Sequence, residues 1–258
     1  MNEELLKNYY NKFNEDKRLN SRHGIVEFNT SIKYILEYLN RFDNPKILDL
    51  GAGTGKYSLY LDSLGYDVTA VELVKHNLKY ITMKNPNIKA FLGNALDLKF
   101  KDESFDFIIM FGPIYHLIDK DEKIKALNEA KRVLKKDGII FICYYMNDYA
   151  VINHGFIDNF ISESINNNEV DNDYKIIGKE NDLYSYSRIE DIDELNKVVG
   201  FDRIDIFTPD LLTDYMRKII NKMDDKTFEA YLDYVYKVSN RKELIGIGSH
   251  IVDIVKKK

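Results

Sequence analysis

The chain has 258 residues, 45% of them hydrophobic and 31% charged, a composition typical of one large globular domain with a sizeable core. Its 37 Lys and Arg against 42 Asp and Glu give a net charge of −5, which weakens the case for a phosphate-binding surface, because such surfaces gather cationic residues on one face. A single cysteine, Cys143, excludes an internal disulfide and a cysteine-based metal cage.

The N-terminal part of the chain predicts two helices ahead of the first strand. Apolar side chains recur at helical spacing in two sets: Leu5, Leu6, Tyr9, Tyr10 and Phe13 within residues 1–20, and Ile32, Ile35, Leu36 and Leu39 within residues 25–41. The opening MNEELLKNYYNKF has no basic segment followed by an apolar core, and no stretch approaches the ~20 apolar residues that span a bilayer. We therefore expect a cytoplasmic protein with no membrane partner.

Short apolar strands then alternate with amphipathic helices over residues 45–145. Strands are expected at 46–50, 66–73, 88–95, 105–111 and 139–145, with helices at 57–64, 75–83 and 122–135 between them. Asp137 and Gly138 are expected to separate the last helix from the last strand. This alternation implies right-handed crossovers and an open parallel sheet with helices on both faces.

The C-terminal part continues the pattern with interruptions. A polar loop is expected at 164–174, a helix at 187–201 that ends at Gly200, and two strands at 203–207 and 246–257. Between those strands, apolar residues step by three and four along 211–223 and 228–236. This spacing predicts an inserted helical hairpin.

Three glycines in five residues follow the first strand in KILDLGAGTGKYSLYL, residues 46–61, and a backbone bent this tightly can approach a ligand closely. The dinucleotide pattern G-x-G-x-x-G fails because Lys56 stands where the third glycine belongs, and the phosphate pattern G-x-x-x-x-G-K-[ST] fails because Tyr57 follows Lys56. Glu72, at the end of the second strand, is placed to accept hydrogen bonds from two ribose hydroxyls. The alternative is a solvated carboxylate at a strand end.

These residues resemble the class I S-adenosylmethionine-dependent methyltransferases. LDLGAGTG is similar to their first motif, VTAVEL to their second, LGNALDLKFKDESFDFIIM to the segment from the adenine site through the fourth strand, and EAKRVLKKDGIIFI to their helix and fifth strand. The resemblance covers residues 20–146 and implies a Rossmann-like α/β fold with a doubly wound, seven-stranded, mostly parallel sheet. It implies S-adenosylmethionine as the cofactor. We predict one methyltransferase domain over 1–258, with capping helices at 1–42, a cofactor-binding core at 45–146 and a helical cap insertion at 209–240.

The resemblance also implies which residues hold the cofactor. On the methionine side they are Asp49, which would hold the amino group, the loop residues Gly51, Ala52 and Gly53, and Phe111 and Gly112 beyond the fourth strand. On the adenosine side, Glu72 would bind the ribose and Leu73 would lie against the adenine. Asn94 and Ala95 stand where the family has Asp-Ala. The Asn94 carbonyl could accept a hydrogen bond from the adenine amino group, without the charge of a carboxylate.

The stretch FGPIYHL, residues 111–117, occupies the position that faces the methyl acceptor in this family. It differs from the Asn/Asp-Pro-Pro-aromatic motif of amino methylation and is similar to the Gly-Pro-x-Tyr-His variant of small-molecule methyltransferases. Tyr115 and His116 are therefore the candidate catalytic residues. His116 could act as a general base, since an unperturbed imidazole titrates near neutrality, or it could be a hydrogen-bonded structural residue. Transfer to a good nucleophile needs mainly in-line positioning, so a dedicated base is not required.

Residues outside the core could complete the site. Arg22 could pair with the cofactor carboxylate and Tyr10 could close over the cofactor, although both residues could equally be surface or packing groups. The tyrosines of the predicted hairpin could stack on a planar acceptor or belong to the core. His154 and His250 show no metal-ligand spacing, so no metal site is predicted.

The sequence favours a methyltransferase that acts on a small molecule by direct displacement. RNA or protein methylation is an alternative that a basic groove beside the pocket would support, but the acidic balance disfavours a nucleic-acid partner. A cofactor-binding regulatory module that transfers no methyl group is another alternative. A nicotinamide dehydrogenase is disfavoured by Lys56 in the glycine loop.

Overall fold

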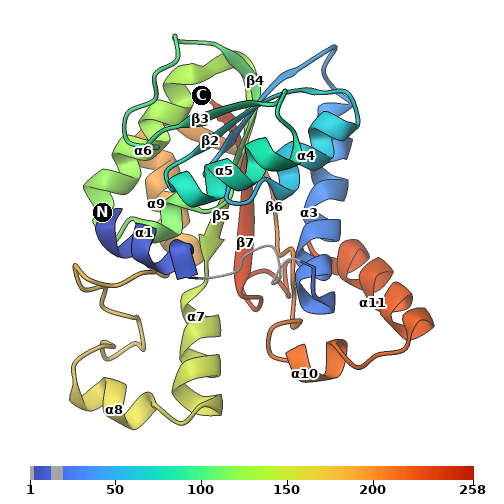
Figure 1. The fold of residues 1–258 in the computed structure, drawn as a ribbon. Helices are drawn as coiled ribbons and strands as arrows, with labels where there is room; N and C mark the ends of the chain where they lie inside the picture. The colour runs from blue at the N-terminus through green and yellow to red at the C-terminus, as the bar shows by residue number, and fades with distance from the viewer. Residues whose placement is uncertain (1–2, 13–19) are drawn as a thin grey trace.

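The computed structural model describes residues 3–12 and 20–258, which are built around one seven-stranded sheet (Figure 1). The strands are β1 (Lys46–Leu50), β2 (Asp67–Glu72), β3 (Lys89–Leu92), β4 (Phe105–Met110), β5 (Leu134–Tyr145), β6 (Phe201–Phe207) and β7 (His250–Lys257). Their order is β3-β2-β1-β4-β5-β7-β6, and β7 runs antiparallel to both of its neighbours while the other pairs are parallel. The predicted doubly wound, mostly parallel sheet is confirmed.

Helices cover both faces of this sheet. They are α1 (Glu3–Lys12), α3 (Arg22–Leu39), α4 (Lys56–Ser63), α5 (Lys75–Lys84), the 3-10 helix η1 (Pro113–His116), α6 (Lys120–Val133), α7 (Asn147–Ala150), the π-helix η2 (Val151–Ile157), α8 (Ile161–Asn166), α9 (Ile189–Val199), α10 (Arg217–Ile220) and α11 (Asp225–Val238). Phe13, which the sequence assigns to the first helix, lies outside the described residues. Within the described ranges, every helix is too short or too polar to cross a bilayer.

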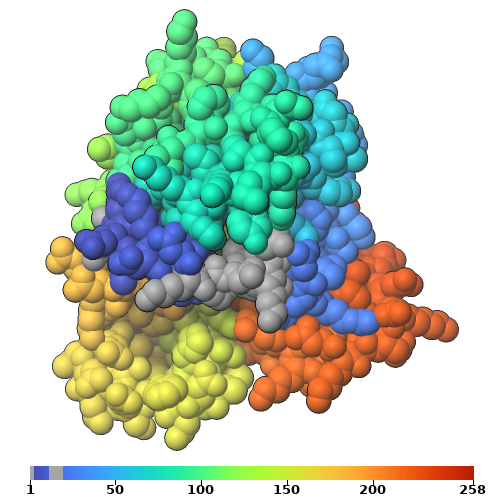
Figure 2. All heavy atoms as spheres, in the orientation of Figure 1, coloured from blue at the N-terminus to red at the C-terminus, as the bar shows by residue number. Residues whose placement is uncertain are grey.

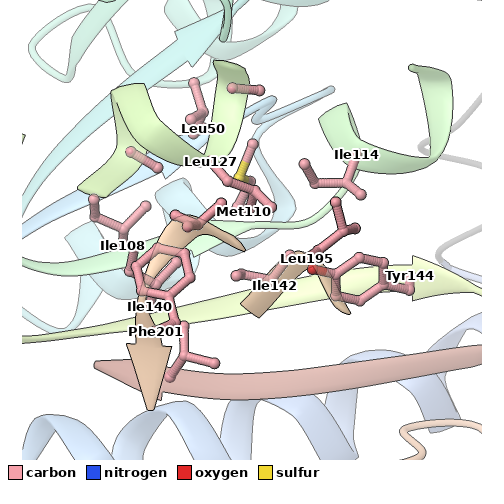
Figure 3. Close-up of a cluster of buried hydrophobic side chains, with 14 of the residues drawn as sticks. Leu50, Ile108, Met110, Ile114, Leu127, Ile140, Ile142, Tyr144, Leu195 and Phe201 are labelled. Carbon is pink, nitrogen blue, oxygen red and sulfur yellow. The ribbon is translucent and has the colours of Figure 1, made fainter. Parts of the chain in front are cut away.

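A hydrophobic core fills the space on each side of the sheet. Along β4, Ile108 and Met110 belong to one core and Phe107 and Ile109 to the other, as the alternation of a strand requires. The first core packs against α6 and α9 and includes Leu127 (Figure 3). The second core packs against α3 and α4. Because the central strands are buried on both faces, their sequences are continuous apolar runs.

The junction between α6 and β5 differs from the prediction. β5 begins at Leu134, directly after α6, so the Asp137-Gly138 pair lies inside the strand. Leu134 pairs with Phe105 of β4, and the register then shifts before the regular pairing resumes at Ile139. Pairing of Leu134 in the sheet thus ends the helix earlier than its apolar spacing indicates.

The segment between β6 and β7 is only partly the predicted helical hairpin. α11 forms the second arm, but the first arm is helical over the four residues of α10, and residues 211–216 form turns. Thr208 Oγ1 accepts a hydrogen bond from the Leu211 N–H at 3.2 Å, and Leu211 has a left-handed φ of 47°. Side chains that bond to nearby backbone in this way compete with helix formation. The limits of the cap insertion, 209–240, stay a prediction.

The chain makes a second excursion after β5. α7 continues from the end of β5, and α8 lies further from the sheet (Figure 1, yellow). The predicted polar loop at 164–174 therefore begins inside α8. The turns after α8 return the chain to the end of the sheet, where the Ser187 N–H donates to the carbonyl of Tyr145 at 2.8 Å.

A buried ion pair at the antiparallel edge gives a test of the fold. Asp253 of β7 is fully buried and accepts hydrogen bonds from Arg203 Nε at 2.5 Å and Asn196 Nδ2 at 2.6 Å. Asp253→Ala should lower the free energy of unfolding by about 3 kcal/mol, because it leaves the buried amide of Asn196 without its acceptor and the Arg203 guanidinium with only its exposed partner Asp193. Urea denaturation measures the loss. The control is Asp233→Ala, which removes an exposed pair with Lys237 and should cost under ~0.5 kcal/mol. Equal losses in both variants would contradict this assignment.

Candidate functional site

A pocket lies at the carboxyl ends of β1, β2 and β4, and α1 forms part of its wall through Leu6 and Tyr10. α1 packs beside α5 on the face shown in Figure 2, where it is dark blue and α5 is teal. Of the residues predicted for the site, all but Arg22 line this pocket: Tyr10, Asp49, Gly51, Ala52, Gly53, Glu72, Leu73, Asn94, Ala95, Phe111, Gly112, Tyr115 and His116. The structure therefore brings together residues from the first helix to the end of β4.

The glycine loop is fixed by its neighbours and leaves open space above Gly53. The backbone N–H groups of Gly51 and Ala52 both donate to the carbonyl of Val71 in β2, at 2.8 and 3.1 Å. A side chain at Gly51 would meet Pro113 Cδ at 2.6 Å, so the loop can approach η1 only with glycine there. Gly53 has φ +56° and nothing lies within 4 Å of where its Cβ would be. The open space therefore belongs to the pocket.

Glu72 braces the glycine loop. One carboxylate oxygen accepts the Gly53 N–H at 2.8 Å, and the other accepts the Val74 N–H at 2.8 Å and the amide of Asn77 at 3.4 Å. Burial raises the pKa of Glu72 to about 7, against the lowering effect of these hydrogen bonds. Each carboxylate oxygen has more than one acceptor position, so the side chain can still accept hydrogen bonds from a ligand.

Asp49 is the second buried carboxylate of the pocket. Its Oδ2 accepts hydrogen bonds from both the N–H and the hydroxyl of Ser58, which opens α4. Burial raises the pKa of Asp49 to about 6, and the bonds from Ser58 oppose that rise. Its other oxygen has no partner among the described residues, so it can accept from a bound ammonium group.

Asn94 lines the pocket, and both ends of its amide are hydrogen-bonded within the protein. Its amide oxygen accepts the Leu96 N–H at 2.9 Å, and its amide nitrogen donates to Glu3 of α1 at 2.7 Å. The amide oxygen already accepts one hydrogen bond from its own loop and keeps a second acceptor position. Its partner Glu3, on α1, was not indicated by the sequence motifs.

His116 and Tyr10 are hydrogen-bonded to each other. His116 Nδ1 lies 2.8 Å from the carbonyl oxygen of Leu183, and Nε2 lies 2.9 Å from the Tyr10 hydroxyl. A carbonyl only accepts, so Nδ1 carries the proton and Nε2 accepts from Tyr10. Burial lowers the pKa of His116 to about 4, and the bond to Leu183 only partly offsets this. His116 is therefore a neutral, already hydrogen-bonded imidazole at neutral pH.

Arg22 is the predicted residue that the pocket lacks. Its guanidinium donates to the Asp225 carboxylate at 2.5 Å and lies 4.9 Å from the ring centre of Phe228. Both partners belong to α11, so Arg22 ties α3 to α11 and is not one of the residues that line the pocket. Glu27, one turn further along α3, lines the pocket instead. No motif marked Glu27, because its place follows only from how α3 packs.

The chain is similar in sequence to methyltransferases and to uncharacterized proteins. A family model described as "Methyltransferase domain" matches residues 48–142. The chain is 30% identical over 215 residues to an uncharacterized protein of Methanocaldococcus jannaschii, with 77% of this chain and 78% of that protein covered. It is 35% identical over 101 residues to the human Probable tRNA methyltransferase 9B, with 37% of this chain and 20% of that protein covered. It spans 41% of the length of the uncharacterized mycobacterial methyltransferases it also matches.

A solved S-adenosylmethionine-dependent methyltransferase of Thermotoga maritima has the same fold, with a TM-score of 0.59, 18% identity and 99% of both chains covered. The matched core, residues 48–142, therefore belongs to the methyltransferase domain family, and the sheet that contains it has the fold of the S-adenosylmethionine-dependent methyltransferases.

S-adenosylmethionine is the cofactor of this family, and the pocket suits its chemistry. The molecule carries a ribose with two hydroxyls, an ammonium group and a positively charged sulfur. Three carboxylates line the pocket, from Glu27, Asp49 and Glu72, and complement these groups. Leu73 and Ala95 offer apolar surface for a base, and the space above Gly53 admits close approach of a ligand. The residues present therefore fit the cofactor.

The open space above Gly53 predicts that a Cβ added at this position will weaken cofactor binding more than it lowers stability. Gly53→Ala should weaken S-adenosylmethionine binding by at least about tenfold, because the new Cβ occupies ligand space, and should cost about 1 kcal/mol of stability from the left-handed φ. Calorimetric titration and urea denaturation measure the two effects. The control is Gly65→Ala. Gly65 has φ +89° and open space where its Cβ would be, as Gly53 has, but it lies outside the pocket. Gly65→Ala should lose the same stability and keep the affinity. Equal affinities for both variants would show that the cofactor does not lie above Gly53.

The pKa of Glu72 predicts a pH dependence of cofactor binding. The ionised carboxylate accepts hydrogen bonds from ribose hydroxyls, whereas its protonated form competes as a donor. Affinity should therefore fall as pH drops through about 7, by up to about tenfold per unit below it, and Asp49 should add to the loss below about 6. Titrations between pH ~8 and ~6 measure this slope. Glu72→Gln should bind S-adenosylmethionine weakly, and its affinity should change little with pH above ~6. If the affinity of this variant depends on pH as that of wild type does, a group other than Glu72 is responsible for the titration.

Proposed function

We propose that this protein transfers the methyl group of S-adenosylmethionine to a small-molecule acceptor in one displacement step. When bound, the cofactor supplies an electrophilic methyl group on a positively charged sulfur, which leaves as a neutral thioether. The observation that carries the proposal is the single pocket that joins the braced glycine loop to Tyr115 and His116. One end of this pocket suits a nucleoside and the other end suits a reacting acceptor.

The residues of the chain bind and orient the reactants in this proposal. Glu72 accepts the ribose hydroxyls, and Asp49 accepts the ammonium group of the cofactor. Leu6 of α1 excludes water from the cavity. Tyr115, at the far side of the glycine loop, lines the wall where an acceptor would sit. In-line placement by these groups is the main requirement for the transfer.

The neutral state of His116 supports a positioning role over that of a base. Its Nε2 lone pair already accepts from Tyr10, and a group with a pKa of about 4 has little capacity to take a proton at neutral pH. We infer that His116 fixes Tyr10, and with it α1, over the pocket. Tyr115 then remains the candidate among the two predicted catalytic residues to touch the acceptor.

The charge of the pocket supports a small molecule over a nucleic acid. Of the described residues that line it, Lys56 is the only one with an always-cationic side chain, against the acids Glu27, Asp49 and Glu72. A phosphate backbone favours the opposite balance. RNA stays a second candidate because of the similarity to the tRNA methyltransferase relative.

The proposal is tested first by calorimetric titration with S-adenosylmethionine and, separately, with NAD. Binding of S-adenosylmethionine alone is expected, since Lys56 breaks the dinucleotide pattern. The protein is then incubated with cofactor labelled on its methyl group and with a low-molecular-mass cell extract, purified tRNA or a protein fraction. Label should enter the low-molecular-mass products with wild type and be lost with Gly53→Ala. Label in tRNA alone would replace the small-molecule proposal, and no cofactor binding would overturn the transferase proposal.

A further inference from the structure

His250 lies next to the pocket wall on its Tyr115 side, although the sequence shows it as an isolated histidine. It opens β7 and pairs with Tyr145, the last residue of β5, and the two rings stack at 4.9 Å with 13° between their planes. The His250 ring is also 6.1 Å from that of Tyr115, which lines the pocket. In the sheet order, β5 and β7 lie beyond β4, away from β2 and its Glu72. His250 therefore stands opposite the nucleoside end.

Asp210 fixes the orientation of this ring. His250 Nδ1 lies 2.7 Å from Asp210 Oδ2, and the Asp210 side chain is buried, with only 2% exposed. Ser249 donates its hydroxyl proton to Asp210 and Asp214, which anchors the carboxylates further. An ionised carboxylate only accepts, so Nδ1 of His250 carries a proton whether the ring is neutral or charged. The other nitrogen, Nε2, is thereby the one that can engage a ligand.

Nε2 of His250 has no hydrogen-bond partner among the described residues. The His250 side chain keeps 12% of its surface exposed, and Nε2 is not one of the fully buried polar atoms that lack a partner. An oriented, nearly buried imidazole with one nitrogen held and the other open is the arrangement by which proteins present a polar contact to a small molecule.

The carboxylates around His250 favour its cationic form, and they are Asp210 and Asp214 before α10 and Glu27 of α3. The cation Arg217 of α10, paired with Asp214, opposes that form. The neutral rings of Tyr115 in η1 and Tyr145 in β5 complete the groups that face the imidazole. Burial alone would lower the pKa of His250, but the hydrogen bond and charge of Asp210, with Glu27 and Asp214, outweigh it and raise the pKa to about 9. Below that pH the ring is an imidazolium whose Nε2–H is a donor.

Aromatic rings complete the surroundings of this donor. The rings of Tyr115 and Tyr145 both contact His250. The Tyr184 ring packs against these two tyrosines, with ring centres 6.2 Å from Tyr115 and 5.5 Å from Tyr145. Burial raises the pKa of Tyr145 far above its usual value, so this phenol stays neutral. Such a wall suits a flat, apolar body, and the imidazolium suits an ionised oxygen at its edge.

We propose that His250, held by Asp210, binds the methyl acceptor through Nε2–H, and that the acceptor is a small aromatic molecule with an ionised oxygen, a carboxylate or a phenolate. This inference rests on the proposed methyl transfer and names the substrate class of the same site. His250 is a binding residue in this role, and the proton stays on the ring.

The test uses benzoate and 4-nitrophenol near pH 8 as ionised probes and benzamide as a neutral probe of the same shape as benzoate. Each is titrated calorimetrically into wild type and His250→Gln, with S-adenosylhomocysteine present. Benzoate, 4-nitrophenol or both should bind wild type at least about tenfold more tightly than the variant, because a charge-assisted hydrogen bond is lost. Benzamide should bind wild type and His250→Gln with equal affinity. Binding of benzoate alone would narrow the class to carboxylates, and binding of 4-nitrophenol alone to phenolates.

Two controls keep the inference separate from the proposed function. His154→Gln removes an exposed imidazole far from β7 in sequence and should leave all affinities unchanged. S-adenosylmethionine should still bind His250→Gln, because His250 is not a hydrogen-bond partner of Glu72 or Asp49, the two carboxylates that hold the cofactor in the proposal. Failure of wild type to bind S-adenosylmethionine would count against methyl transfer itself. Normal cofactor binding with equal probe affinities in wild type and His250→Gln, or with no ionised probe bound at all, would overturn the inference alone.

A measurement on the wild-type protein makes the result independent of how the variant folds. The histidine Cε1–H resonances are followed by NMR against pH and against benzoate, with His250 assigned from the spectrum of the variant. The His250 resonance should titrate near pH 9, shift on addition of the ionised probe, and lose that shift above about pH 10. A probe-induced shift confined to other histidines would contradict the placement of the acceptor.

Discussion

The site depends on one buried carboxylate that ties two loops of the sheet together. Glu72 ends β2 and accepts the N–H of Gly53 from the loop after β1 and the N–H of Val74 from its own loop. Burying this charge is costly, as the rise of its pKa to about 7 shows, and the two backbone bonds offset part of that cost. These bonds hold the loop backbone where a ligand can lie against Gly53, and they keep the Glu72 carboxylate, a hydrogen-bond acceptor, beside the same space. The carboxylate that holds the loop is therefore the one that would accept the ribose hydroxyls in the proposed function.

The two histidines near the acceptor end show how local partners set opposite charge states. His116 faces a carbonyl and a phenol, so burial dominates and its pKa falls to about 4. His250 faces a buried carboxylate, so the same burial is outweighed and its pKa rises to about 9. One ring is thus a neutral link between η1 and α1, and the other is a fixed cation at the end of β7. Two groups of one type whose pKa values are shifted in opposite directions can take separate roles in one site.

The parts of the structure that follow from local sequence were predictable, and the parts that follow from distant contacts were not. The strand, the glycines and Glu72 lie within 26 residues of one another and carry their own turn and period signals. His250 and Asp210 are 40 residues apart and meet only because β7 returns antiparallel between β5 and β6. Likewise, the helical spacing after Thr208 did not reveal that its side chain would cap a turn.

α1 connects the two ends of the pocket mechanically. At the nucleoside end, Glu3 accepts a hydrogen bond from Asn94, and at the other end Tyr10 donates to His116. Leu6, between them in the helix, lies in the pocket wall. A 10-residue helix is stiff on this length scale, so a displacement that breaks one of these contacts also strains the other. In the proposed function, one element would therefore cover the cofactor and shape the acceptor side, because α1 is held at both ends of the pocket.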